Sequence, residues 1–160
     1  MIRPVAISDA QTLLSIYNYY VLNTVVTFDL EALSLDMFTD KIKSIITDYP
    51  FLVYEENNEI LGYAYGSRFR PKPAYNNTVE STVYVKNGAH GKQIGTKLYN
   101  ELLKLLKKEK FHVVLGVLTL PNDASVKLHE KFGFTKVAHL KEAGLKFGDW
   151  QDVGFWQLTF

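Results

Sequence analysis

The segment from Val79 to Leu118 constrains the fold of this chain more than any other. A run of β-branched and aromatic residues, Val79–Val85, precedes a polar loop, Lys86–Gln93, and from Ile94 leucines recur at helical spacing. Residues three and four apart lie on one face of a helix, so this part predicts an amphipathic helix. The apolar stretch Phe111–Leu118 then indicates another strand. Strand, helix and strand in this order predict a crossover connection within a mixed α/β fold.

The other patterns agree with this α/β class. The polar turn at residues 56–59 separates two apolar runs and predicts an antiparallel hairpin. Ser8, followed three residues later by Gln11, indicates a capping box that opens a helix, and Ser34 indicates the start of a second helix. Further strands are expected at 2–6, 134–140 and 153–158, with a short helix between Asn122 and Lys131. Because no repeat or linker interrupts these patterns, residues 1–160 are expected to form a single domain.

Composition excludes several classes of protein. Lys plus Arg number 18 and Asp plus Glu 17, a net charge of +1, so no basic surface for nucleic acid is expected. No apolar run approaches the roughly 18 residues of a membrane span. The chain has no cysteine, which excludes a thiol nucleophile and disulfides and indicates the cytoplasm. The four histidines do not have the spacing of metal ligands, so no metal site is expected.

The loop before the central helix has the chemistry of an anion site. The first N–H groups of a helix lack intrahelical acceptors, and the helix dipole favours negative charge there. Gly91 and Gly95 allow a ligand to approach the backbone closely, which favours phosphate, although an ordinary strand-to-helix turn can also contain two glycines. The segment does not have the spacing of a Walker loop or of a dinucleotide-binding loop.

The same loop resembles the pyrophosphate loop of the GNAT N-acetyltransferases, whose pattern is [QR]-x-x-G-x-[GA]. The six places are filled by His90, Gly91, Lys92, Gln93, Ile94 and Gly95. His90 and Gln93 replace two of the three marked residues. The resemblance implies a GNAT fold with a mixed, mostly antiparallel sheet, and acetyl-CoA bound at His90 to Thr96. In this family the loop contacts its ligand mostly through backbone N–H groups, and Gln93 can supply such a group if its φ stays negative.

A second segment, Asn122–Phe134, resembles the same superfamily's N-x-x-[AS]-x-x-[LY]-x-x-x-x-G-F pattern. Within the superfamily, stretches such as Thr78–Val85 resemble the phosphinothricin N-acetyltransferases, a family that includes acetylases of methionine sulfoximine and methionine sulfone. The likeness extends over almost the whole chain. It implies a homodimer to which the C-terminal strands contribute, with acetyl transferred directly to the amine of a small amino-acid-like acceptor.

The resemblance also assigns roles around the acetyl-CoA site. It implies that Glu80 faces the acceptor amine as a general base, whereas the residue alone favours a surface side chain or a partner of Arg70. Backbone groups of Val83, Tyr84 and Val85 would contact pantetheine and hold the thioester oxygen. Asn122 would contact pantetheine, cap a helix, or do both. His129 stands where many relatives have a tyrosine that protonates the CoA thiolate, and simple packing is the alternative.

The acceptor site is expected around the loop before the strand that carries Glu80. Arg70 and Tyr75 suit a carboxylate or phosphinate, and Phe28 and Lys146 are expected at the far wall, with Phe28 alternatively in the core. Two other functions stay open. One is acetylation of a different amine, such as a protein N-terminus or a polyamine. The other is a catalytically silent acyl-CoA-binding module, suggested by His90 and Gln93.

Overall fold

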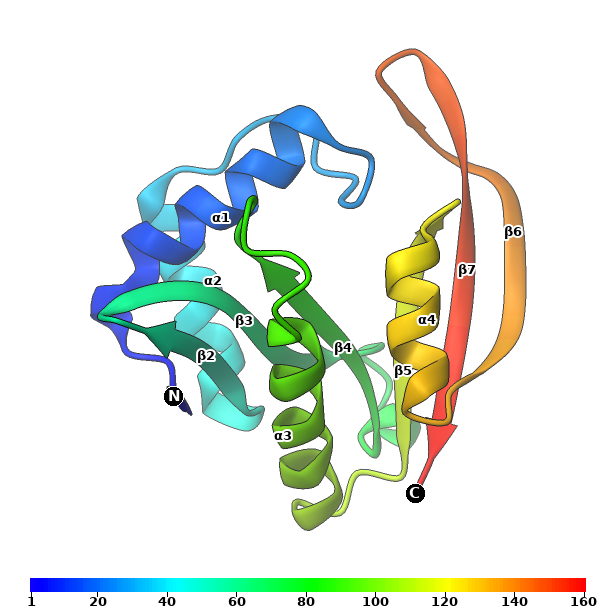
Figure 1. Ribbon diagram of the computed structural model, residues 1–160. Helices are drawn as coiled ribbons and strands as arrows, with labels where there is room; N and C mark the ends of the chain where they lie inside the picture. The colour runs from blue at the N-terminus through cyan, green and yellow to red at the C-terminus, as the bar shows by residue number, and fades with distance from the viewer.

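The computed structural model describes residues 1–160 as four helices, two short 3-10 turns and seven strands (Figure 1). In chain order the helices and strands are β1 (Ile2–Pro4), α1 (Ala10–Asn23), α2 (Leu35–Asp48), β2 (Phe51–Glu56), β3 (Glu59–Arg68), β4 (Thr78–Val85), α3 (Ile94–Lys108), β5 (Val113–Leu120), α4 (Asp123–Lys131), β6 (Thr135–Lys146) and β7 (Asp149–Thr159). None of the helices has the length and apolar composition that a membrane crossing requires.

All seven strands belong to one sheet, in the order β1-β2-β3-β4-β5-β7-β6. β4 and β5 are parallel and are connected through α3, whereas every other neighbouring pair is antiparallel. The predicted crossover and the mixed, mostly antiparallel sheet are therefore confirmed.

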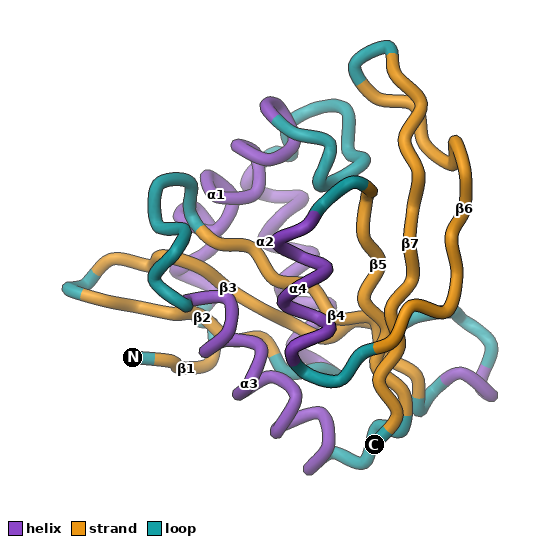
Figure 2. Tube along the Cα trace, turned by 45° about the vertical axis from the view of Figure 1, so that its right-hand side comes forward, coloured by secondary structure: helices purple, strands orange, loops and turns teal.

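Two apolar clusters lie on opposite faces of this sheet. Successive side chains of a strand point to opposite faces, so Tyr63 packs with α1 and α2 while its neighbour Ala64 packs with α3. Figure 2 shows α3 and the pair α1 and α2 on the two sides of β2 and β3. The central strands are thus covered on both faces, which fixes the position of β4 between two helical layers.

The two predicted helix caps have different outcomes. Ser34 caps α2 as expected, since its hydroxyl accepts a hydrogen bond from Met37 N at 3.2 Å. The capping box at Ser8 and Gln11 was wrong. The Asp9 carboxylate accepts from Ala6 N at 2.8 Å and pairs with Arg3, and a charged acceptor with a guanidinium partner outcompetes a serine hydroxyl.

The C-terminal strands are longer than the sequence predicts. β6 and β7 form a hairpin whose turn contains Phe147 and Gly148, both at positive φ, 53° and 81°. Most of β6 is exposed, so it lacks the alternation of apolar residues that marks a strand in sequence. In Figure 1 this hairpin extends beyond the rest of the sheet on the side where β4 and β5 end.

Candidate active site

The site lies where β4 and β5 separate. Their parallel pairing ends at Ser81 and Gly116, although β4 continues to Val85 and β5 to Leu120. Figure 1 shows the two strands diverging toward these ends. The β4 edge that faces β5 therefore has backbone N–H and C=O groups without a ladder partner, and such groups require water or a ligand.

Two adjoining cavities fill the space between the strands. One, of about 300 Å³, contains Glu80 and is called the Glu80 cavity; the other, of about 540 Å³, lies at the start of α3 and is called the loop cavity. The loop cavity lies within the usual size range of small-molecule sites, and the Glu80 cavity lies at the lower limit of that range. They share five lining residues, Val26, Val83, Tyr84, Asn122 and Ser125. The two cavities thus adjoin, so one ligand can extend from the loop before α3 toward the Glu80 carboxylate.

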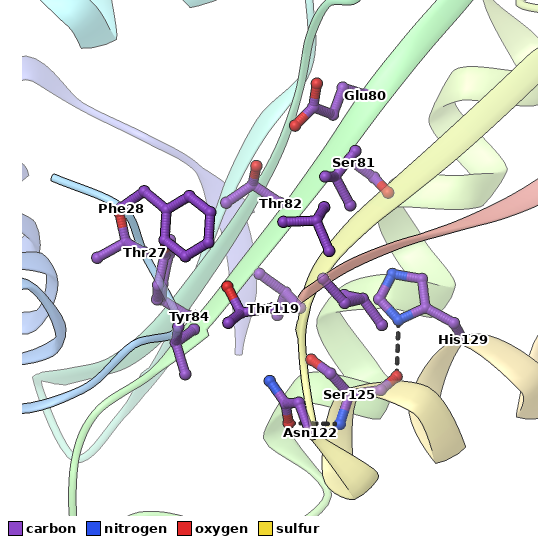
Figure 3. A pocket seen from close by; sticks show the side chains of 15 residues that line it. Thr27, Phe28, Glu80, Ser81, Thr82, Tyr84, Thr119, Asn122, Ser125 and His129 are labelled. Atoms are coloured by element: carbon purple, nitrogen blue, oxygen red, sulfur yellow. Dashed lines mark hydrogen bonds between the residues drawn. The ribbon is translucent and has the colours of Figure 1, made fainter. Parts of the chain in front are cut away.

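Glu80 projects from β4 at one end of its cavity (Figure 3). It is half-buried, and burial raises the pKa of its carboxyl above the usual value for glutamic acid. The positive charge of Lys41 lowers the pKa of Glu80 and opposes part of that shift. No ion pair joins Glu80 to Arg70. A carboxylate with a raised pKa beside a cavity is suited to accepting a proton.

Lys41 is a neighbour of Glu80 that the sequence reasoning missed. Its Nζ lies 5.0 Å from the centre of the Tyr17 ring and 5.8 Å from that of Tyr65, and no carboxylate pairs with it. On α2, residue 41 lies three after Phe38 and four before Ile45, both of them buried. A lysine within the apolar stripe of a helix is the signal that could have identified it.

His129, on α4, also lines the Glu80 cavity. Its Nδ1 donates a hydrogen bond to the Ser125 carbonyl at 2.7 Å, and its ring packs edge-on against Tyr99 and Phe134. Nε2 faces Gly116, where an added Cβ would come within 2.2 Å of it. The side chain is only 2% exposed, and burial lowers its pKa below the usual value. His129 is therefore a neutral, tightly packed imidazole at neutral pH.

Asn122 begins α4 at the border of the two cavities. Its Oδ1 accepts from Ser125 N at 3.2 Å, which confirms the helix-cap interpretation (Figure 3). The side chain lines both cavities, so the cap and a ligand contact are compatible.

The loop that leads into α3 has free backbone donors at the loop cavity. The first helical hydrogen bond runs from Lys97 N to Gln93 O, which leaves the N–H groups of Ile94, Gly95 and Thr96 without intrahelical acceptors. No side chain caps this end. Oriented N–H groups at a helix N-terminus can bind an anionic group such as a phosphate.

The conformation of Gln93 differs from the expectation. We expected a negative φ at this position, but the structure has φ 59° and ψ 19°, the left-handed region. A side chain there costs about 1–2 kcal/mol relative to a right-handed conformation, and glycine avoids this cost. The helix nevertheless begins at the next residue, Ile94.

Most of the predicted site residues line one or both of the cavities. Glu80, Phe28 and His129 line the Glu80 cavity, Asn122, Val83 and Tyr84 line both cavities, and the loop cavity also contains Val85, His90, Gly91, Gln93, Ile94, Gly95 and Thr96. Four predicted residues line neither cavity: Arg70, Tyr75, Lys92 and Lys146. Arg70 is exposed and stacks on Phe69 and Tyr75 in the loop before β4, 5.1 and 5.9 Å from the two ring centres.

Lys146 and Phe28 join the loop at residues 24–34 to the β6–β7 hairpin. The buried Lys146 donates to the Thr27 carbonyl at 2.7 Å, and burial lowers its pKa. The Phe28 ring lies over Gly144, where a Cβ would come within 2.3 Å of it. Gly144 was not among the residues identified from sequence. Phe28 is 38% exposed and is therefore a wall of the cavity and not a core residue.

Comparison with known proteins agrees with this arrangement. Residues 2–154 match the family model described as acetyltransferase (GNAT) domain. The chain is 39% identical to a phosphinothricin N-acetyltransferase of Streptomyces viridochromogenes, covering 99% of this chain and 87% of that protein.

Two solved structures are also very similar. A phosphinothricin acetyltransferase from Sinorhizobium meliloti, solved in complex with acetyl-CoA, is 31% identical with a TM-score of 0.97, covering 100% of this chain and 88% of that one. A ribosomal-protein-alanine N-acetyltransferase from Brucella melitensis is 34% identical with a TM-score of 0.98, covering 100% and 99%. The free donors at the loop cavity thus occur in a fold that binds acetyl-CoA, and the chain belongs to the GNAT family as an acetyl-CoA-dependent N-acetyltransferase related to the phosphinothricin and methionine sulfoximine enzymes.

Proposed function

We propose that this protein, acting as one domain over residues 1–160, acetylates the amino group of a small amino-acid-like acceptor. Phosphinothricin, methionine sulfoximine and methionine sulfone represent the acceptor type. One observation carries the proposal: a half-buried carboxylate, Glu80, lies in a cavity of about 300 Å³ that adjoins the loop cavity. A cavity of this volume suits a small acceptor together with an acetyl group.

Glu80 is the general base of the proposed reaction. A free amine is mostly ammonium at neutral pH and must lose a proton before it attacks. The raised pKa of Glu80 makes its carboxylate a better acceptor for that proton, directly or through water. The amine nitrogen then bonds to the thioester carbon, the C–S bond breaks, and CoA leaves as the thiolate. The nitrogen loses a second proton to form the amide, and the thiolate takes up a proton to give the CoA thiol.

Other residues hold the reacting groups. Backbone N–H groups among Val83, Tyr84 and Val85 that point to the β5 side suit the developing negative charge on the thioester oxygen, because this edge of β4 is unpaired while the other edge pairs with β3. Protonation of the thiolate by His129 stays a prediction. Since its Nδ1–H is bound to Ser125 and burial lowers its pKa, His129 must first gain a proton at Nε2, and packing of α4 is the role that its contacts favour.

An anionic group on the acceptor needs a nearby cation. Lys41 acts on Glu80 from α2 and has no carboxylate partner, which supports it beside Arg70 and Tyr75 as a candidate.

We also propose a homodimer. Large exposed apolar side chains gather on the β6–β7 hairpin, a surface typical of a protein interface: Val137, Leu140, Leu145, Phe147 and Trp150.

A second acceptor class has support from one relative. The Brucella melitensis protein carries the name of an enzyme that acts on a ribosomal protein's alanine, so a protein N-terminus is the alternative acceptor. The Glu80 cavity disfavours this alternative, because a chain terminus with its following residues requires an open groove and not a small cavity.

Thiol release from acetyl-CoA tests the proposal. We expect turnover with at least one of the three amino-acid analogues, with kcat/KM roughly tenfold or more above that for spermidine or an alanyl peptide. The chain has no cysteine that would add background. Turnover with the peptide alone would assign the alternative, and CoA binding without any turnover would indicate a silent module.

A further inference from the structure

A single tyrosine hydroxyl contacts both the last residue of β4 and a histidine in the loop that joins β4 to α3. Tyr20, in the last turn of α1, is 8% exposed and donates a hydrogen bond to the Val85 carbonyl at 2.5 Å. The same oxygen lies 3.3 Å from His90 Nε2. Val85 ends β4, and His90 lies five residues further along the chain.

The protons of this contact can be assigned. A phenol has one proton, and Val85 O receives it, so the Tyr20 oxygen accepts from an N–H at His90 Nε2. Burial raises the pKa of Tyr20 to about 12. The phenol thus stays protonated at neutral pH and keeps both contacts.

Few other contacts hold the loop: Ala89 is buried in the core, and its N–H donates to the Lys86 carbonyl at 2.9 Å. Gly88, Gly91 and Gln93 have positive φ, and the first two leave the chain flexible before folding. Between Lys86 and Gln93, only two side chains form hydrogen bonds, Lys86 to Glu59 and His90 to Tyr20. His90 also occupies the place where the pyrophosphate pattern has Gln or Arg.

We propose that Tyr20 is a positioning residue for the CoA site, which it serves by tethering His90 and Val85. The inference rests on the proposed acetyl-CoA site. Tyr20 lines the loop cavity, but its hydroxyl is engaged by the protein, so its effect reaches the ligand through the conformation of the loop. The tether also explains how His90 functions at the first position of the pyrophosphate-loop pattern, because the Tyr20 phenol accepts the hydrogen bond that holds the imidazole in place.

Titration calorimetry with CoA itself tests the tether. We expect Tyr20→Phe to weaken CoA binding roughly tenfold, since it keeps the ring but removes both hydrogen bonds. With saturating acetyl-CoA, kcat should stay within about twofold, because positioning of the loop affects binding and not the Glu80 cavity. Tyr19→Phe is the matched control, because Tyr19 is exposed and its hydroxyl forms no hydrogen bond.

His90 variants separate a tether from a merely structural effect. His90→Ala should weaken CoA binding, and combining it with Tyr20→Phe should add little, because the two changes break the same contact. His90→Gln retains an N–H donor and should bind CoA nearly as wild type. Equal affinities of Tyr20→Phe and Tyr19→Phe, or fully additive effects, would overturn the inference. CoA binding that responds to these variants without any acetyl transfer would overturn the proposed function and leave the tether standing.

Discussion

Glu80 and Lys41 form an electrostatic pair whose effect on rate depends on pH. Glu80 is active as the carboxylate, so kcat/KM should rise with pH through the raised pKa of Glu80, at a pH above the usual value for glutamic acid. Lys41 stabilises the ionised form. Lys41→Met should therefore raise the pKa of Glu80 further and move the acidic limb of the kcat/KM profile to higher pH.

Profiles of kcat/KM from acid to neutral pH measure this shift. Lys43→Met is the control, since Lys43 is exposed on the same helix and lies 3.8 Å from Asp40. An acidic limb that stays in place in Lys41→Met would show that Lys41 does not act on the base.

The left-handed backbone conformation of Gln93 predicts how a glycine at this position changes the stability of the protein. Gln93→Gly removes a side chain from a left-handed position, and we expect it to raise the free energy of unfolding by up to about 1 kcal/mol after the flexibility of glycine is included. Lys92→Gly, at a neighbouring position without positive φ, should instead lower it by about 0.5–1 kcal/mol. Denaturant unfolding compares the two; a loss of stability in Gln93→Gly would contradict the account.

Single residues differ in how far the sequence predicts them. Asn122 was identifiable because a cap is a local property of a helix start. The positive φ of Gln93 was not, since it depends on how the loop joins β4 to α3. Lys41 and Gly144 act across elements far apart in the chain, and one sequence does not show which elements meet.

At the scale of elements, the loop at residues 24–34 owes its position to the hairpin. Phe28 reaches the cavity wall by lying over Gly144, which has no side chain to obstruct it. Gly144→Val should displace Phe28 and lower kcat/KM for the acceptor by roughly 10- to 100-fold. The KM for acetyl-CoA should change little, because neither residue lines the loop cavity.

Steady-state kinetics with each substrate varied in turn measures this separation. Ala143→Val adds bulk at the preceding, exposed position and is the control. Equal losses in both variants would mean that the hairpin, and not the Phe28 contact, determines acceptor binding.

Elements with a buried face were the ones that could be predicted. The apolar stripes of α2 and α3 and the apolar runs of β2 and β3 identified them from sequence. The extra length of β6 and β7 was missed, because exposed strands have no core-facing alternation.

For the whole molecule, the divergence of β4 and β5 creates the site. It brings Glu80 of β4 together with Asn122 and His129, which lie at the start and in the last turn of α4, around one cavity. The fold class was predictable from the order of strands and helices. The cavity was not, since it depends on where a strand pairing ends.

The exposed hairpin predicts association of two copies. Trp150→Glu combined with Phe147→Ser should convert a dimer into a monomer, because it replaces two side chains that are each 60% exposed and apolar. Sedimentation measures the mass. Met37→Glu, at an equally exposed site on α2, should leave the dimer intact, and a wild-type monomer would contradict the proposal.

The rate and stability of Glu80→Gln test the central claim most directly. Loss of the base should lower kcat by about 10²- to 10⁴-fold. The raised pKa means that ionised Glu80 costs stability once the pH rises through it, so the glutamine variant should unfold at a higher temperature at neutral pH. A variant that is both slower and more stable confirms Glu80 as a half-buried base. Unchanged kcat in Glu80→Gln would contradict the account.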